Sequence, residues 1–142
     1  MIYYMVKEDY VSFETAKLLK EKGFDWVCHA TYDTAVTGGK PKFSEYEVLS
    51  YFPYGMKNTD DKYSMIISAP TIQLAMKWLR EVHNIHIVVH PYTDEEGQNW
   101  SFIFDKYTYG CWQELGIYIT DSWSSYEEAC EVAIKYCLDK LI

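Results

Sequence analysis

The order of its periodic segments constrains the fold of this 142-residue chain more than any other feature. Helical periodicity marks residues 13–22, residues 72–83 and the stretch after Ser125, and extended segments stand between them in groups. A doubly wound parallel sheet requires strict alternation of strand and helix, which this order lacks. The sequence therefore predicts a single α+β domain over residues 1–142, with a mostly antiparallel sheet of about four to six strands and three helices packed mainly on one face.

The first predicted helix has a recognisable residue at each end. Ser12 is the expected N-cap, and Gly23 can adopt the left-handed conformation that ends a helix. Leu19 and Phe24 are then placed for the apolar contact that accompanies such a C-cap. The residues predicted to face the core here are Val11, Leu18 and Leu19.

The other two helices also begin at expected caps. Pro70 and the cap residue Thr71 precede the second helix, and Ser125 with Glu128 forms a capping box in which Glu128 reaches back to the start of the third. The predicted apolar stripe of the second helix is Ile72, Ala75, Met76, Leu79 and Val82, and that of the third is Ala129, Val132, Ala133, Tyr136 and Cys137.

Aromatic and β-branched segments predict the strands, which are expected at residues 26–32, 44–52, 63–67, 85–90, 100–106 and 114–120. The second strand is expected to break at Pro53 to Gly55. Residues 34–42 are expected to form a loop. Residues 57–62 are predicted to be the most exposed and flexible loop, and the acidic stretch 93–99 is predicted to join two strands of a meander.

The charge of the chain argues against two classes of partner. A net charge of −8 and a pI near 4.9 give a surface that repels nucleic acid and anionic membranes. Neither a secretory signal nor an apolar run of membrane-spanning length is visible, which predicts a cytoplasmic protein. The four cysteines, which lack paired or metal-finger spacing and are expected to be reduced, are Cys28, Cys111, Cys130 and Cys137.

Three histidines lie close together in the sequence, but their spacing does not suit a metal. On a strand, His86 and His90 would share a face about 13 Å apart, beyond the reach of one ion. His83 falls at the end of a helix, where it is expected to complement the helix dipole. No metal and no cofactor are predicted.

Cys28 and His29 are the nearest approach to a catalytic pair. Neighbours on a strand point to opposite faces, so these two cannot bond each other, and Cys28 is interpreted as a small buried hydrophobe. A hydrolase that uses Cys28, served by a remote histidine, or that uses a histidine itself stays open as a third interpretation. With no catalytic set in the sequence, the chain is predicted not to be an enzyme.

The aromatic content is the unusual feature, with 14 tyrosines and 5 tryptophans. Such side chains serve binding surfaces well, although a thin domain also needs wide rings to fill its core. The leading hypothesis is a non-enzymatic protein that binds another protein, or a second copy of itself as a homodimer, through an aromatic and acidic surface. The alternative is binding or sequestration of a small planar, nucleotide-like ligand, with Arg80 or Lys106 as its cation. The candidate binding residues are Tyr46, Tyr51, Tyr54, Arg80, Trp100, Lys106, Tyr107, Tyr109 and Trp112.

Three sequence stretches, taken together, resemble those of a known protein family. They are YVSFETAKLLKEKGFD at 10–25, SAPT at 68–71 leading into KWLRE at 77–81, and SYEEAC at 125–130. In this order they resemble a family of short uncharacterised proteins found in gut Bacteroidales genomes and in their phages and mobile elements. The resemblance implies a bacterial or phage origin, and the binding hypothesis would then make the chain an accessory factor of a phage or mobile element. It implies no activity, cofactor or catalytic residue.

Overall fold

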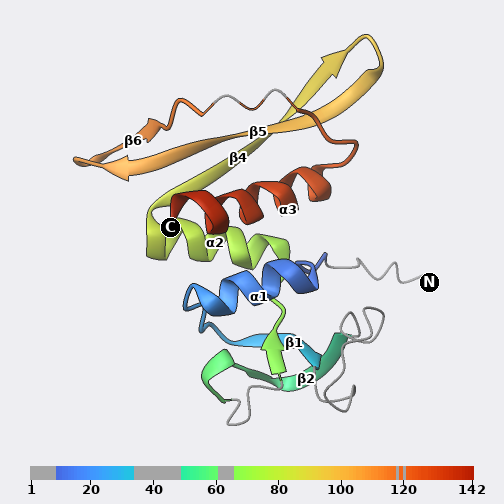
Figure 1. The fold of residues 1–142 in the computed structure, drawn as a ribbon, viewed down its shortest axis with the longest axis vertical. Coiled ribbons are helices and arrows are strands. Elements are labelled where there is room, and N and C mark those ends of the chain that lie inside the picture. Colours follow the sequence, from blue (N-terminus) through green and yellow to red (C-terminus); the bar gives the residue numbers. More distant parts are fainter. Residues whose placement is uncertain (1–8, 34–48, 61–65, 118, 120) are drawn as a thin grey trace, which may run out of the picture.

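The computed structural model describes residues 9–33, 49–60, 66–117, 119 and 121–142, with the backbone alone for residues 33 and 49–53 (Figure 1). These residues form three α-helices, six strands, a short 3-10 helix and a closing π-helical turn. In chain order the elements are α1 (Phe13–Glu21), β1 (Cys28–Asp33), β2 (Leu49–Met56), the 3-10 helix (Asn58–Asp60), β3 (Ile66–Ser68), α2 (Ile72–His83), β4 (Ile85–Asp94), β5 (Gly97–Thr108), β6 (Cys111–Glu114), α3 (Tyr126–Tyr136) and the π-helical turn (Cys137–Leu141).

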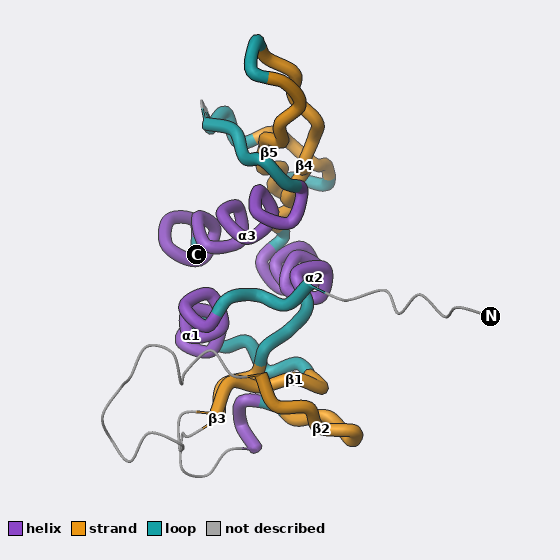
Figure 2. The backbone as a smooth tube through the Cα atoms, turned by 90° about the vertical axis from the view of Figure 1, so that its right-hand side faces the viewer, coloured by secondary structure: helices purple, strands orange, loops and turns teal. Residues whose placement is uncertain are grey.

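The strands form two separate antiparallel sheets, and the helices lie between them (Figures 1 and 2). The first sheet has the order β2-β1-β3, and the second sheet has the order β4-β5-β6. α2 and α3 contact the second sheet, α1 contacts β3 of the first sheet, and α3 also contacts α1 and α2. The α+β class and the antiparallel pairing are thus confirmed, and each sheet has the helices on one of its faces.

The strands separate into two sheets because α2 is buried on more than one side. Its contacts with β4 hold the second sheet, while Trp78 on the same helix packs edge-on against Phe24 near the first sheet, with ring centroids 5.4 Å apart. A helix with two covered sides lies inside a layer rather than on a surface. The buried residues consequently form one cluster that draws on all three helices and both sheets.

The predicted ends of α1 are confirmed in detail. The side chain of Ser12 accepts a hydrogen bond from the amide of Thr15. At the other end, Gly23 is left-handed, with φ +89°. The Gly23 amide donates a 3.1 Å hydrogen bond to the Lys20 carbonyl, and the Phe24 amide donates a 2.9 Å bond to the Leu19 carbonyl. This pair of bonds is a Schellman motif, and both Leu19 and Phe24 are buried beneath it.

The prediction for α2 needs one correction. Thr71 caps the helix through the amide of Leu74, as expected, and four of the five stripe residues are buried or nearly so. Val82 is 50% exposed, because Leu79 is the last buried residue of α2 and the final turn extends beyond the packed layer. The unpredicted Trp78 is buried instead.

The prediction for α3 is confirmed at its cap and wrong in one detail. The Ser125 side chain accepts a hydrogen bond from the Glu128 amide at 3.1 Å. The Glu128 carboxylate accepts from the hydroxyl of Ser124 rather than reaching back to Ser125. The buried face is also wider than expected, with Val132 and Tyr136 only partly buried; its members are Ala129, Cys130, Ala133, Ile134, Cys137 and Leu138.

Several strand predictions are corrected as well. β2 continues through Pro53. Proline has no amide hydrogen to donate, but Pro53 lies where the register between β1 and β2 shifts, so the regular hydrogen-bond pattern does not require a donor there. The 57–62 stretch is not uniformly exposed, because Asn58 is buried. In the second sheet, β4 and β5 extend to a tight turn at residues 95–96, and the third strand lies at 111–114 rather than 114–120. The predicted loop at 34–42 and the strand residues 44–48 and 63–65 lie outside the described residues.

Candidate functional site

The outer face of the second sheet, which we define as its face turned away from the helices, carries the candidate site. Along β5, Phe102 and Phe104 point to the helices and are buried, and Phe104 stacks on Tyr136 of α3 at 5.4 Å. Because side chains alternate along a strand, Ile103 and Tyr107 belong to the outer face. No helix covers this face in the described part of the chain (Figures 1 and 2).

Exposed rings gather where β5 turns into β6. Tyr107 and Trp112 are register partners with ring centroids 5.4 Å apart, and they are 44% and 45% exposed. His86 of β4 meets the Trp112 ring edge-on at 5.9 Å. Tyr109 in the turn is fully exposed. We call these four residues the aromatic end.

The backbone at Tyr109 is unusual for its residue type. Tyr109 and Gly110 connect the paired residues Thr108 and Cys111, and their φ angles are +52° and +81°. Two successive left-handed residues define a type I′ turn, whose first position favours asparagine, aspartate or glycine. A tyrosine held there costs about 1–2 kcal/mol, and such strain is concentrated at functional sites. The exposed ring of Tyr109 is therefore kept at a position that does not favour it for folding.

Two carboxylates, those of Asp105 and Glu114, lie on strands beside the aromatic end. The register places His86, Asp105 and Glu114 side by side across the three strands of the second sheet. From residue 85 to residue 123 the sequence contains six carboxylates and one lysine, a net charge of −5 out of the −8 of the chain. That lysine, Lys106, pairs with the buried Ile85 and so projects on the helix side. The strands of the second sheet thus carry no lysine or arginine on the outer face.

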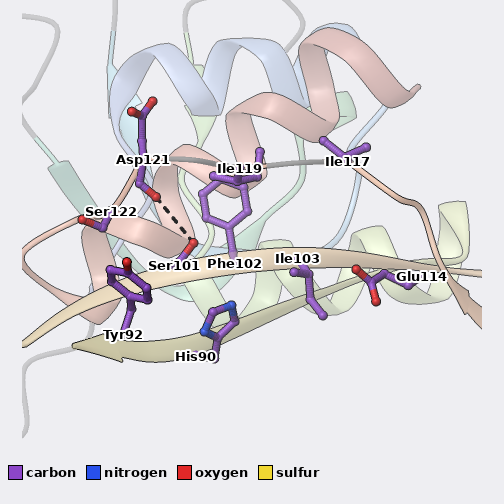
Figure 3. Close-up of a pocket in the computed structure, with 10 residues that line it drawn as sticks. All are labelled: His90, Tyr92, Ser101, Phe102, Ile103, Glu114, Ile117, Ile119, Asp121 and Ser122. Atoms are coloured by element: carbon purple, nitrogen blue, oxygen red, sulfur yellow. Dashed lines mark hydrogen bonds between the residues drawn. The ribbon is translucent and has the colours of Figure 1, made fainter. Parts of the chain in front are cut away.

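A pocket of about 380 Å³ lies at the edge of β5, lined both by residues of the outer face such as Ile103 and by Phe102, which points to the helices (Figure 3). Two anchors hold the returning chain against β5: the Leu115 amide bonds the Phe104 carbonyl at 2.8 Å, and Trp100 and Trp123 exchange two bonds of 2.8 Å. Between the anchors the returning chain has seven residues, 116–122, against the three of β5, 101–103. A ladder matches residues one for one, so the longer segment cannot pair fully and the pocket lies between the two.

The lining of this sheet-edge pocket is apolar and acidic. Figure 3 shows Tyr92, His90 and Ile103 in a row along the strands, with the carboxylate of Glu114 pointing toward Ile103. The carboxylate of Asp121 points away, while its carbonyl accepts a 3.5 Å bond from the Ser101 hydroxyl. The described residues of the lining, which include no lysine or arginine, are His90, Tyr92, Ser101, Phe102, Ile103, Glu114, Ile117, Ile119, Asp121 and Ser122.

Three of the nine predicted binding residues come together in the structure, namely Tyr107, Tyr109 and Trp112. Tyr54 is 98% exposed but belongs to the first sheet. Tyr46 lies outside the described residues, as does the side chain of Tyr51, whose backbone pairs with Ala30. The other predicted residues lie elsewhere: Arg80 on α2, Lys106 on the helix side of β5, and Trp100 against Tyr126 at 5.4 Å.

Sequence reasoning missed the contribution of His86 and the whole sheet-edge pocket. Alternation along β4 could have placed His86, His90 and Tyr92 on one face. It could not have shown that the ring of Trp112 contacts His86, because that depends on the position of the β5–β6 turn.

The residues considered for catalysis or metal binding, Cys28 and the histidines among them, are not arranged for either role in the described part of the chain. Burial raises the pKa of Cys28 to about 12, which keeps its thiol protonated at neutral pH and does not suit a nucleophile. Burial, with Lys22 nearby, lowers the pKa of His83, so the expected favourable charge at the helix end is not supported. Among the described residues, no three histidine, cysteine, aspartate or glutamate side chains gather so as to hold a metal ion. No described helix has the length and apolar character needed to cross a membrane.

Comparisons with protein-family models, with curated proteins and with solved structures found no match. The family resemblance of the three sequence stretches therefore stays a prediction. The candidate site rests on its own geometry.

Proposed function

We propose that this chain is a non-enzymatic binding protein of the cytoplasm that holds another protein against the outer face of its second sheet. The observation that carries the proposal is the aromatic end, where Tyr107, Tyr109 and Trp112 are all exposed beside His86. Tyrosine and tryptophan dominate the energetics of protein interfaces because they bring large contact area with few rotatable bonds. The strained Tyr109 supports the same conclusion, since folding alone would favour another residue there.

The charge of the outer face defines the class of partner. Asp105 and Glu114 flank the rings, and the strands of the second sheet present no lysine or arginine on this face. Arginine and lysine side chains stack on aromatic faces and pair with carboxylates. The partner is therefore a protein with an exposed basic segment. In the setting of the family that this chain resembles, that protein would come from a bacterial host, a phage or a mobile element. A second copy of this acidic chain offers the same charge and is the poorer fit.

The nucleotide-like ligand has less support. Its phosphates would need a cationic side chain in the pocket. Neither Arg80 nor Lys106 lines the sheet-edge pocket, and among the described lining residues the carboxylate of Glu114 points inward while that of Asp121 points away. The charge of the pocket thus favours a cation over an anion.

Affinity capture from bacterial lysate with matched variants tests the proposal. Trp112→Ala and Tyr109→Asn each remove one ring from the aromatic end, and the latter does so at a turn position that favours asparagine. Tyr54→Ala removes an equally exposed ring from the first sheet and serves as the control. We expect a stoichiometric partner that is retained by wild type and Tyr54→Ala, is lost from both aromatic-end variants, and is released by high salt.

Three results would contradict the proposal. They are the recovery of no stoichiometric partner, equal recovery by all four proteins, and recovery of this chain alone as a dimer that high salt does not weaken.

A further inference from the structure

The sheet-edge pocket combines an apolar wall with hydrogen-bond acceptors at its mouth. Ile103, Ile117 and Ile119 form the apolar wall, and the Glu114 carboxylate points toward Ile103 (Figure 3). The lining also includes Tyr92, Ser122 and Asp121, whose carbonyl accepts a bond from Ser101, so further oxygen atoms lie close by. A volume of about 380 Å³ suits a small ligand or a single long side chain.

We propose that this pocket receives an arginine side chain from the basic segment of the partner, an inference that rests on the proposed function. The methylene stem would lie along Ile103 and Ile117, and the guanidinium would form a bidentate pair with Glu114. Its remaining N–H groups would donate to oxygens of the lining. No lysine or arginine among the described lining residues opposes the charge.

Arginine fits this lining better than lysine does. The rings of His90 and Tyr92 lie along the pocket, and a planar guanidinium stacks on such rings. Five donors in a fixed fork also match acceptors spread over several residues better than one compact ammonium. A hydrated lysine head would leave most of these oxygens without a partner.

Glu114 lines the pocket and also lies next to the aromatic end, so one extended segment can use both. Glu114 follows Trp112 by two residues on β6 and therefore shares its face. The aromatic end would supply contact area, and the pocket would supply the choice of side chain.

Small probes test the pocket without the partner. Nα-acetyl-arginine methylamide is titrated into the ¹⁵N-labelled protein, with the corresponding lysine and citrulline compounds as comparisons. We expect saturable shifts at the amides of Ile103, Ile117 and Ile119, with arginine binding at least about fivefold more tightly than lysine and citrulline not binding measurably.

Matched variants assign the binding to Glu114. Glu114→Gln should weaken the arginine probe at least about fivefold. Glu95→Gln removes the same charge from the exposed β4–β5 turn and should leave binding unchanged. Tyr54→Ala, which removes an exposed ring from the first sheet, should also leave the probe affinity unchanged.

The outcomes distinguish this inference from the proposed function. Equal binding of the lysine or citrulline probe, equal effects of the two glutamate variants, shifts confined to the Trp112 indole, or no saturable shift would each overturn the arginine pocket. Partner capture that still depends on Trp112 would then leave the proposed function standing. Loss of that dependence with intact arginine binding would overturn the proposed function alone.

Discussion

The Nδ2 atom of Asn58 donates a 2.7 Å hydrogen bond to the carbonyl oxygen of Phe24. On its other side, the Oδ1 atom of Asn58 accepts a 2.9 Å bond from the amide of Ser68. One buried side chain thereby joins the end of the α1 cap to β3 across 34 residues of sequence on one side and 10 on the other.

Replacing Asn58 should destabilise the fold strongly. Asn58→Ala leaves the Phe24 carbonyl and the Ser68 amide without this partner, and each unpaired buried group costs about 1–3 kcal/mol. We expect the free energy of unfolding, measured by urea titration, to fall by about 2–4 kcal/mol. Lys57→Ala changes the exposed neighbouring residue and should cost less than about 0.5 kcal/mol. A comparable loss in both variants would show that the Asn58 bonds do not matter.

Gly55 should resist substitution for two separable reasons. Its φ is +74°, and a Cβ atom there would overlap Cγ1 of Val27. We expect Gly55→Ala to cost about 2 kcal/mol, against about 1 kcal/mol for Gly23→Ala, where φ is also positive and the space is open. Adding Val27→Ala should recover only part of the Gly55 loss, because the backbone strain stays. Full recovery in the double variant, measured by thermal unfolding, would assign the whole effect to the overlap.

Tyr109 should limit the stability of the turn that presents it. Tyr109→Asn places a residue suited to the left-handed conformation at φ +52° and should raise the free energy of unfolding by about 0.5–1 kcal/mol. The same substitution at the exposed Tyr54 should not stabilise the protein. An unchanged or lowered stability of Tyr109→Asn would mean that the tyrosine makes compensating contacts in the free protein.

The four cysteines should differ sharply in reactivity. Burial raises the pKa of Cys28 and Cys137 to about 12 and that of Cys130 to about 11, whereas Cys111 is exposed. A disulfide reagent at mildly alkaline pH should therefore modify one thiol quickly, and Cys111→Ser should remove that fast phase. Concentrated denaturant should release all four. A fast reaction at Cys28 would contradict its burial and would revive the hydrolase interpretation.

His83 should make stability depend on pH in the weakly acidic range. Burial lowers the pKa of His83 below its ordinary value near 6.5, so the unfolded chain binds the proton more readily. The stabilising contribution is therefore present above about pH 6.5 and is lost as the pH falls through the folded-state pKa. Urea titrations at a series of pH values should show a shallower decline for His83→Gln than for wild type. Identical slopes for the two proteins would contradict the assignment to His83.

The sequence was a good guide to the helices because their signals are local. Ser12, Thr71 and Ser125 each bond an amide three residues later, and Gly23 supplies the left-handed end of α1. These signals act within one turn and need no knowledge of the rest of the chain.

The arrangement of strands was harder to predict because it depends on pairing at a distance. Alternation shows which residues share a face of a strand, but it does not show that β3 pairs with β1 while β4 pairs with β5. The third strand of the meander was misplaced because the turn at Tyr109 lacks the residue that normally announces such a turn. Asn58 likewise resembles a loop residue until its two distant partners are known.

The candidate site was predicted in part for the same reasons. Tyr107, Tyr109 and Trp112 follow one another closely in sequence, so any hairpin brings them together. The sheet-edge pocket arises from a mismatch between the lengths of two paired segments, and that mismatch becomes visible only when both anchors are known.

The helices that separate the two sheets also connect them mechanically. Phe24 beneath the first sheet touches Trp78 of α2, and Phe104 of the second sheet stacks on Tyr136 of α3. Loss of either sheet would expose apolar side chains of the helical layer. Because the other sheet packs on the same layer, it would be destabilised as well. Mechanical force or denaturant should therefore unfold the whole domain in one cooperative step. Neither half of the domain should stay folded as a separate fragment.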